Sequence, residues 1–367
     1  MRGWIRIDRV DFTRGAVSLS VDSRGHDAAL EHLDELLEQC RSRGLTRIAV
    51  AFAERERSER ALLDYLLARH GAVVERRRPA RRPRGADAWS STARVSGEAA
   101  TVEYSLRLDN LATALDRTTT AAILIGCASD LDQTTRSHLR LAMYELAVNS
   151  VEHGEFQNDA PEIRIAVRVS RARAWLYYMD NGALFVTGKH MHMDIADKIA
   201  QRDKRGLGLY ILNKLANTIE YKRLQDWNVT TLVFEAKEER TTQSYRRPAM
   251  EGIAIETQPC NLPGTVIVKP AGSIDSATTA ILEAHFDALI AQNTRRIVID
   301  FAQVDFISSA GVGILLGTVS LLRSEGGDLV FTNLPGHIEE VFDIINLKSF
   351  FRTIDSIDEL EAVEQKK

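Results

Sequence analysis

The chain has 367 residues, and this length predicts about two or three folding units rather than one hydrophobic core. Hydrophobic residues make up 44% and charged residues 27% of the sequence, as in water-soluble globular proteins, and no apolar run approaches the roughly 20 residues of a membrane helix. The formal net charge of −4, from 47 basic and 51 acidic residues, gives no overall field that would attract nucleic acid.

The start of the chain and its cysteines predict a cytoplasmic protein. Residues 1–10 alternate polar and apolar side chains and lack the charged head, apolar stretch and cleavage site of a secretion signal. The cysteines are Cys40, Cys127 and Cys260. Because they are odd in number and far apart, they predict neither a disulfide framework nor a clustered zinc site. A reducing cytoplasm fits this pattern.

Residues 1–90 are predicted to form a small α/β domain. The segment is expected to run strand, helix, strand, helix, strand. The strands are expected at Val17–Val21, at Arg47–Phe52 and after the second helix, and the helices at Ala28–Cys40 and Arg60–Arg69. The basic run Arg76–Arg84, which follows the second helix, is broken by Pro79 and Pro83. It therefore cannot form a regular helix and predicts an exposed linker. A contact with nucleic acid or an anionic membrane is the alternative for this run.

The layout of this first segment weakly resembles the C-terminal half of the acetyltransferase (GNAT) fold. In that resemblance Arg24-Gly25 would stand at the cofactor loop and Leu62–His70 at the last helix. The loop lacks the usual glycine spacing, and the half that would hold an acceptor is missing. A docking or degenerate module is therefore the favoured interpretation.

Residues 98–238 are predicted to form an α+β sandwich in which helices cover one face of a sheet. Alternating apolar residues predict its strands, and apolar residues three and four apart predict its helices. The expected strands are Ala100–Leu108, Glu162–Val169, Ala174–Met179, Thr218–Arg223 and Val229–Glu235, and the expected helices are Leu111–Ile125, Leu131–Glu152 and Gly208–Ala216.

Residues 250–367 alternate strands and helices, which predicts a parallel or mixed sheet with helices packed against it. A polar linker at 237–248 separates this segment from the preceding one. The expected strands are Gly252–Glu256, Thr265–Lys269, Arg296–Phe301 and Asp328–Thr332, and the expected helices are Ala277–Gln292, Ser309–Ser324 and Ile338–Ile345. The whole chain is therefore expected to be a multidomain α+β and α/β protein.

One helix of the middle segment offers polar side chains along one edge. Glu145, Asn149 and His153 follow one another four residues apart, so they point the same way at the border of an expected cavity. An amide oxygen is a hard ligand suited to Mg²⁺, and a neighbouring carboxylate can accept the proton of a hydroxyl that attacks phosphate. A solvated helix face is the alternative for this pattern taken alone.

Two glycine-containing segments follow that helix. A strand runs into Asp180-Asn181-Gly182, and Arg205-Gly206-Leu207-Gly208 opens a later helix. Glycines at a helix start let backbone N–H groups approach phosphate oxygens, where the helix dipole also favours negative charge. An Asp at a strand end can accept a hydrogen bond from the adenine amino group. Each glycine pair alone also fits a turn or a helix end, but the three signals in this order predict a nucleotide site.

These motifs resemble those of the GHKL (Bergerat) ATPase superfamily and, within it, the anti-sigma factor serine kinases. Glu145 to Gly154 resembles the N box, Asp180 to Phe185 the first glycine box, and Gly206 to Gly208 the second. The resemblance implies a GHKL sandwich that binds ATP and Mg²⁺.

The same resemblance assigns roles to single residues. Asn149 would hold Mg²⁺, Glu145 would be the general base, and Asp180 would bind adenine. Thr230 or Thr231 would support Asp180, since only one of two consecutive strand residues can face the base. The residues implied in ATP binding are Asn149, Asp180, Gly182, Arg205, Gly206, Leu207 and Gly208.

Other members of the superfamily fit less well. Histidine kinases need a phosphoacceptor His on a preceding helix hairpin, and gyrase-like ATPases need a transducer domain; neither is expected in this sequence. The lid segment contains His190 and His192, which could suggest a metal, but no further ligand is near them in sequence. We therefore expect no metal at these histidines.

The C-terminal segment resembles the STAS domain of anti-sigma factor antagonists. The resemblance rests on Val304–Ile307 followed by Ser308, Ser309, Gly311 and Gly313, and it places Ser309 at the phosphorylated position. A phosphate there would meet unpaired N–H groups and the positive end of a helix dipole. In the family an Asp often precedes the phosphoserine, whereas here Ser308 does. A simple N-cap role for Ser309 is the alternative.

Together these resemblances imply an Mg-ATP-dependent serine kinase whose own STAS domain is its substrate or an internal competitor. The implied partners are STAS-domain or sigma-factor-like proteins, with no direct contact to nucleic acid or membrane. A homodimer is also expected, because kinases of the resembled family usually pair. The alternative is a non-catalytic ATP-sensing scaffold in which nucleotide controls docking of the STAS domain.

Overall fold

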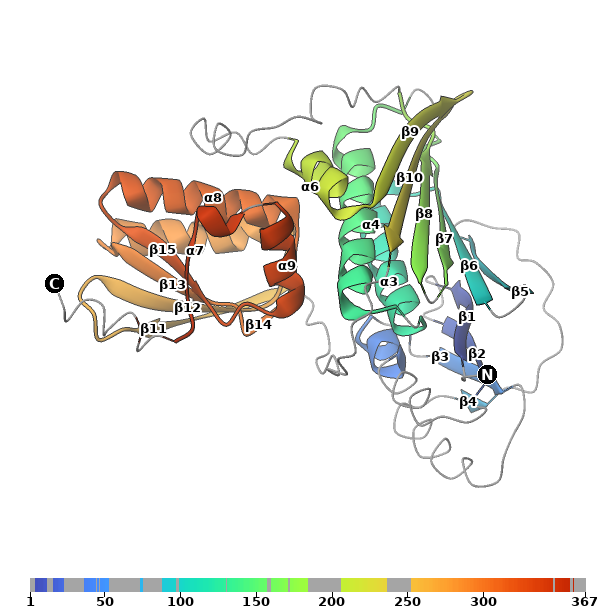
Figure 1. Ribbon diagram of the computed structural model, residues 1–367, viewed down its shortest axis with the longest axis horizontal. Coiled ribbons are helices and arrows are strands. Elements are labelled where there is room, and N and C mark those ends of the chain that lie inside the picture. The colour runs from blue at the N-terminus through green and yellow to red at the C-terminus, as the bar shows by residue number, and fades with distance from the viewer. Residues whose placement is uncertain are drawn as a thin grey trace. The chain divides into compact units, whose positions relative to one another are not determined.

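The computed structural model divides the chain into two compact units (Figure 1). The first comprises Met1–Val186 and Ala216–Pro248, and the second comprises Thr187–Leu215 and Ala249–Lys367. The structure describes residues 4–11, 16–22, 36–43, 45, 47–52, 73–74, 88–96, 99–129, 131–156, 160–170, 172–183, 206–235, 252–345, 347–356 and 359.

The first unit begins with a four-stranded sheet in the order β1-β2-β3-β4. Strands β1 and β2 are antiparallel, and β2, β3 and β4 are parallel. The bounds are β1 (Trp4–Asp11), β2 (Ala16–Asp22), β3 (Arg47–Phe52) and β4 (Val73–Val74). A helix that includes residues 36–42 buries Leu36, Leu37 and Cys40. The predicted α/β character is confirmed, with β1 as an additional strand. The GNAT-like loop at Arg24-Gly25 and the expected helix Arg60–Arg69 lie outside the described residues.

A six-stranded antiparallel sheet forms the larger part of the first unit, in the order β5-β6-β7-β8-β10-β9. Burial alternates along its strands: in β7, Ile163 and Ile165 are buried whereas Arg164 between them is exposed. The sequence did not predict β5, which pairs with β6 over its whole length. The strands are β5 (Ala88–Ser96), β6 (Ala99–Leu108), β7 (Ile163–Val169), β8 (Arg173–Asp180), β9 (Thr218–Leu224) and β10 (Trp227–Glu235).

Helices α3 (Leu111–Cys127) and α4 (Gln133–His153) lie side by side against one face of this sheet (Figure 1). Both begin at a capping side chain. The Asn110 amide oxygen accepts from the N–H of Ala112 at 3.0 Å, and the Asp132 carboxylate accepts from that of Thr135 at 2.8 Å. The predicted sandwich with helices on one face is confirmed.

The second unit contains helix α6 (Leu207–Leu215) and a mixed sheet. The sheet order is β11-β12-β13-β15-β16, with β14 also pairing with β12; β11 is antiparallel to β12 and the other pairs are parallel. The remaining elements are β11 (Ile253–Pro259), β12 (Thr265–Ile274), α7 (Thr279–Ala291), β13 (Arg296–Asp300), β14 (Gln303–Ile307), α8 (Ser309–Ser324), β15 (Asp328–Thr332), α9 (Gly336–Ile344), the 3-10 turn Leu347–Ser349 and β16 (Arg352–Ile354).

Four phenylalanines fill the core between this sheet and α9: Phe301, Phe331, Phe342 and Phe351, with ring centroids 4.3–6.2 Å apart. Offset and edge-to-face ring pairs of this kind add to the stabilisation from burial. The mixed sheet confirms the prediction for this segment. In either unit, none of the helices that the structure describes has the length and apolarity needed to cross a membrane.

The start of α8 packs closely on the ends of β12 and β14. A Cβ added at Gly311 would lie 2.7 Å from the Ile274 carbonyl oxygen, 2.8 Å from Ile274 Cγ2 and 2.9 Å from Ile307 Cγ1. These distances are shorter than carbon contacts allow, and two of the three atoms that would have to move belong to one buried strand end. The helix can therefore approach the sheet this closely only with glycine at position 311.

We predict that Gly311→Ala destabilises the second unit by roughly 1–3 kcal/mol, because the added methyl forces the helix away from the sheet. Gly336→Ala is the matched control: Gly336 also lies in the first turn of a helix, and an added Cβ meets nothing within 4 Å. Calorimetry of the full chain is the suitable measurement, because no tryptophan follows Trp227. Equal melting temperatures for the two variants would contradict the prediction.

Candidate functional site

The carboxylate of Asp180, at the end of β8, accepts hydrogen bonds from three directions. Its Oδ1 accepts from Nδ2 of Asn228 at 2.8 Å and from the backbone N–H of Gly182 at 3.0 Å. Its Oδ2 accepts from the hydroxyl of Ser150 at 3.3 Å. Ser150 lies on α4, and Asn228 is paired in register with Asp180 across β10 and β8. A carboxylate has about four acceptor positions, so one on Oδ2 remains for a ligand.

Tyr178 extends this network into the core. Its phenol is 2% exposed and donates to the Ser150 hydroxyl at 3.0 Å. Burial raises the pKa of this phenol above its usual range, and the negative charge of Asp180 acts in the same direction. The phenol therefore stays neutral and remains a donor, which leaves the proton of Ser150 for Asp180.

The β9–β10 hairpin holds the loop that follows Asp180. Nδ2 of Asn228 also donates to the Ala183 carbonyl at 2.9 Å. Nη1 of Arg223 donates to the Gly182 carbonyl at 2.7 Å and to Oδ1 of Asn228 at 2.9 Å. Because a guanidinium can only donate, the amide oxygen of Asn228 must face Arg223 and its NH₂ group must face Asp180. On the other side of the loop, the N–H of Ala183 donates to the Glu155 carbonyl at 2.6 Å.

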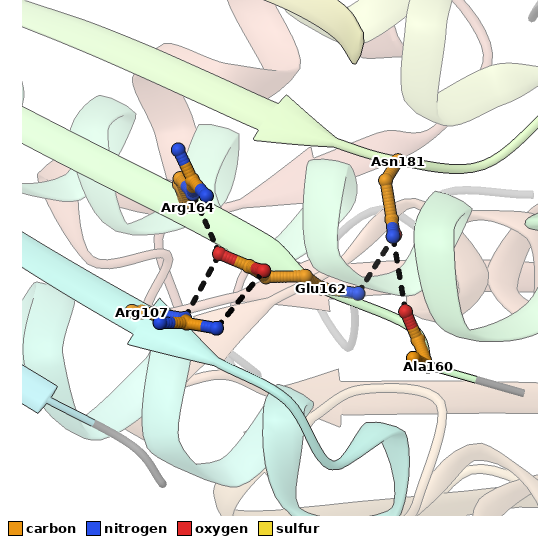
Figure 2. Close-up of polar contacts among 5 residues, drawn as sticks. All are labelled: Arg107, Ala160, Glu162, Arg164 and Asn181. Carbon is orange, nitrogen blue, oxygen red and sulfur yellow. Dashed lines mark hydrogen bonds and ion pairs between the residues drawn. The ribbon is translucent and has the colours of Figure 1, made fainter. Parts of the chain in front are cut away.

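Asn181, next to Asp180, joins the end of β8 to the start of β7 (Figure 2). Its Nδ2 donates to the Ala160 carbonyl at 3.0 Å, and its Oδ1 accepts from the N–H of Glu162 at 2.7 Å. The Glu162 carboxylate in turn pairs with Arg107 at 2.9 Å and Arg164 at 2.6 Å. Since both arginine side chains are about half exposed, these ion pairs add little stability. The bonds of Asn181 to the backbone fix the point at which β8 ends.

The three polar residues along α4 differ in burial. Glu145 is 2% exposed, Asn149 is half-buried and His153 is exposed. Nδ2 of Asn149 is enclosed and has no hydrogen-bond partner among the described residues. An NH₂ donor without a partner fits a ligand that offers an acceptor, such as a phosphate oxygen, whereas the oxygen of the same amide is of the type that suits Mg²⁺.

No cluster of three or more His, Cys, Asp or Glu able to hold a metal occurs in the described part of the chain. His190 and His192 lie outside that part, so the structure does not test them. Cys40, Cys127 and Cys260 are all free thiols.

The second glycine motif starts α6. Gly206 has a φ of 77°, a conformation that glycine adopts without strain, and its carbonyl accepts from the N–H of Tyr210 at 3.3 Å. Leu207 and Gly208 are buried in the first turn of the helix. Arg205 lies outside the described residues. These positions belong to the second unit, whereas Glu145, Asn149, Asp180 and Gly182 belong to the first.

Ser309 is the first residue of α8 and is half-buried, whereas its neighbour Ser308 is 1% exposed. Ser308 is the N-cap: its hydroxyl accepts from the N–H of Gly311 at 3.3 Å, and its own N–H donates to the Ile274 carbonyl at 2.9 Å. The alternative of Ser309 as the N-cap is therefore wrong. The capping function is met by Ser308, which stands where the family often has Asp, another good N-cap residue.

Sequence reasoning missed the residues that hold Asp180. The expected support from Thr230 or Thr231 is not among the hydrogen bonds of Asp180, whose donors are Asn228, Gly182 and Ser150; Thr230 is paired with Tyr178, two residues before Asp180. Asn228 is the residue in register. Asn228 lies two residues from Thr230 and therefore on the same face of β10. This two-residue alternation was the only signal in the sequence that could have indicated Asn228.

Comparison with known proteins places the C-terminal part of the chain. Residues 258–360 match the family model of the STAS domain. Over 93 residues the chain is 37% identical to BtrV of Bordetella bronchiseptica, whose name describes it as an anti-sigma factor antagonist; the match covers 25% of this chain and 80% of BtrV. The chain belongs to the STAS family.

In this STAS-family protein, residues 104–234 match the model of the histidine kinase-like ATPase domain. The fusion predicted from the sequence is thereby confirmed, and the ATPase-like domain implies ATP binding. A second relative is the anti-sigma-B factor antagonist of Bacillus subtilis, 31% identical over 81 residues, which covers 22% of this chain and 73% of that protein. A solved anti-sigma factor antagonist from Mycobacterium paratuberculosis is 26% identical with a TM-score of 0.28, covering 30% of this chain and 94% of that one.

We predict that the buried phenol of Tyr178 makes the folded protein less stable as the pH rises above about 10. Its folded-state pKa lies above the value of about 10 in an unfolded chain, so the unfolded chain loses the proton first as pH rises. Its contribution to the free energy of unfolding is full below about pH 10 and falls by up to about 1.4 kcal/mol per pH unit above it.

Urea unfolding of the wild type and Tyr178→Phe from about pH 8 to pH 11 measures this contribution, because the other titrating groups cancel in the difference. Below pH 10 the wild type should be more stable by about 1 kcal/mol, from the bond to Ser150. The advantage should shrink above that pH. A constant difference would contradict the prediction.

Proposed function

We propose that this STAS-family protein is a partner-switching regulator whose ATPase-like domain is an Mg-ATP-dependent serine kinase of the anti-sigma factor type. The observation that carries the proposal is the half-buried Ser309 at the first position of α8, in the same chain as a kinase-like ATPase domain. Because Ser308 does the capping, the hydroxyl of Ser309 is not needed to start the helix. Its modification can therefore change the surface without unfolding the domain.

In the proposed reaction the Ser309 oxygen bonds to the γ-phosphorus of ATP, and the bond from that phosphorus to the β-γ bridging oxygen breaks, releasing ADP. Glu145 accepts the proton of the serine hydroxyl, Asn149 offers its amide oxygen to Mg²⁺, and Asp180 accepts from the adenine amino group. Mg²⁺ supplies charge neutralisation at the phosphates. The phosphate adds about −1.5 to −2 charge at the start of α8.

The partners in this proposal are the chain's own STAS domain and free STAS-domain or sigma-factor-like proteins. BtrV and the Bacillus subtilis relative are named as anti-sigma factor antagonists, which supports this class. A covalent tether holds the STAS domain at an effective concentration of order mM, so it competes with free partners. Cytoplasmic location and pairing of two copies are parts of the same proposal.

A second candidate function is a non-catalytic, ATP-sensing scaffold in which nucleotide controls docking of the STAS domain. The burial of Glu145, 2% exposed, favours it, because a general base must reach the hydroxyl that it deprotonates. The absence of an Asp before Ser309 points the same way. The two candidates differ in one measurable property, which is transfer of phosphate.

We predict that the full chain, incubated with Mg²⁺ and γ-labelled ATP, incorporates label at Ser309 and that Ser309→Ala abolishes it. Ser324→Ala is the matched control, because Ser324 is an exposed serine at the other end of the same helix. If the chain binds ATP but neither it nor an added STAS protein becomes labelled, the result would favour the scaffold over the kinase.

We also predict that Glu145→Gln binds ATP as the wild type does but transfers phosphate slower by roughly 10²–10⁴-fold, the usual contribution of a general base. Glutamine keeps the shape of the buried side chain and removes only its basicity. Single-turnover labelling beside equilibrium ATP binding separates the two effects. Transfer at the wild-type rate would remove Glu145 from the reaction.

A further inference from the structure

We propose that Asn228, oriented by Arg223, is the positioning residue that gives this site its preference for adenine. The inference rests on the proposed nucleotide site and deepens it. Asn228 does not need to touch the nucleotide. It acts through Asp180, whose Oδ1 it binds at 2.8 Å, and through the loop carbonyl of Ala183, which it binds at 2.9 Å.

The hydrogen bonds of Asp180 leave one defined position for a base. Oδ1 already accepts two donors, from Asn228 and Gly182, and Oδ2 accepts one, from Ser150. The free acceptor position therefore lies on Oδ2, on the side of α4. Adenine presents an amino donor at C6, whereas guanine presents an oxygen acceptor there. A carboxylate fixed in this orientation accepts the first and repels the second.

Asn228 makes the shortest of the three contacts to the Asp180 carboxylate, 2.8 Å, against 3.0 Å from the N–H of Gly182 and 3.3 Å from the hydroxyl of Ser150. The terminal torsion of an aspartate is broad, so the carboxylate turns readily unless donors hold both oxygens. Ser150 lies 3.3 Å away, a long contact for a hydroxyl, while the amide of Asn228 is closer and is itself fixed by Arg223. The same guanidinium and amide hold the carbonyls of Gly182 and Ala183, so one hairpin sets both the acceptor and its loop.

Comparing two nucleotides isolates this role. The probes are ATP and purine riboside triphosphate, which is the same molecule without the 6-amino group. We expect the wild type to bind ATP more tightly by on the order of tenfold, the effect of one hydrogen bond to a charged acceptor. In Asn228→Ala the ratio of the two affinities should fall to about twofold or less, because the Asp180 carboxylate is no longer held in place.

Asn217→Ala is the matched control. Its Oδ1 accepts from the N–H of Glu235 at 2.8 Å, so Asn217 is also an asparagine bonded to β10, but at the opposite end of that strand. The ratio of the affinities for ATP and purine riboside triphosphate should be the same in this variant as in the wild type. Arg223→Lys keeps a positive charge but loses the fork that orients the amide, and should give an intermediate ratio.

Asn228→Asp provides a test that does not depend on removing a side chain. It replaces the donor by a second carboxylate beside Asp180, so the ratio should be lost at neutral pH.

The outcomes separate the inference from the function on which it rests. If Asn228→Ala and Asn228→Asp weaken the binding of both nucleotides by the same factor, the ratio of the two affinities stays that of the wild type. The positioning role is then wrong, while the nucleotide site stands. If the wild type binds neither nucleotide, the proposed function itself fails. Loss of the wild-type preference for ATP over purine riboside triphosphate in both variants, with that preference kept in Asn217→Ala, supports the inference.

Discussion

The hydrogen bonds that converge on the Asp180 carboxylate organise the first unit. Their donors come from helix α4, from strand β10 and from the loop that Asp180 itself begins. A carboxylate that is partly withdrawn from water needs donors of this kind, since an unmet charge there would cost several kcal/mol. The requirement ties the register of β8 and β10 to the position of α4. Displacing α4 or β10 would remove one of its three donors.

The same network connects the two ends of the proposed reaction site. Ser150, which binds Asp180, directly follows Asn149 along α4. The residue that would face adenine, at the end of β8, is thus linked through Ser150 to the helix that carries the residue that would face the metal. Tyr178 secures that helix from the core, where its phenol cannot ionise near neutral pH. Precise spacing between the base and the phosphates of a nucleotide requires this kind of rigid support.

In the second unit, the close packing of helix α8 against the sheet fixes the geometry of the candidate site. Gly311 lets α8 press against the ends of β12 and β14, and Ser308 closes the helix start by binding both β12 and the first turn. With capping and packing carried by these two residues, Ser309 keeps a partly exposed hydroxyl beside the positive end of the helix. A chemical change at Ser309 can therefore alter the local charge and leave the core of four phenylalanines in place.

The amino-acid sequence by itself determined the order of elements, the two family resemblances and the position of Asp180, because periodicity and short motifs are local properties of the chain. It could not identify Asn228 as the partner of Asp180, since that depends on the strand register, which long-range packing sets. It missed β5 because Ala88–Ser96 has small and polar residues, and its strand conformation goes with its pairing to β6. The choice of Ser308 over Ser309 as N-cap was likewise decided by tertiary structure. The Ile274 carbonyl holds the N–H of Ser308, and that contact fixes where α8 begins.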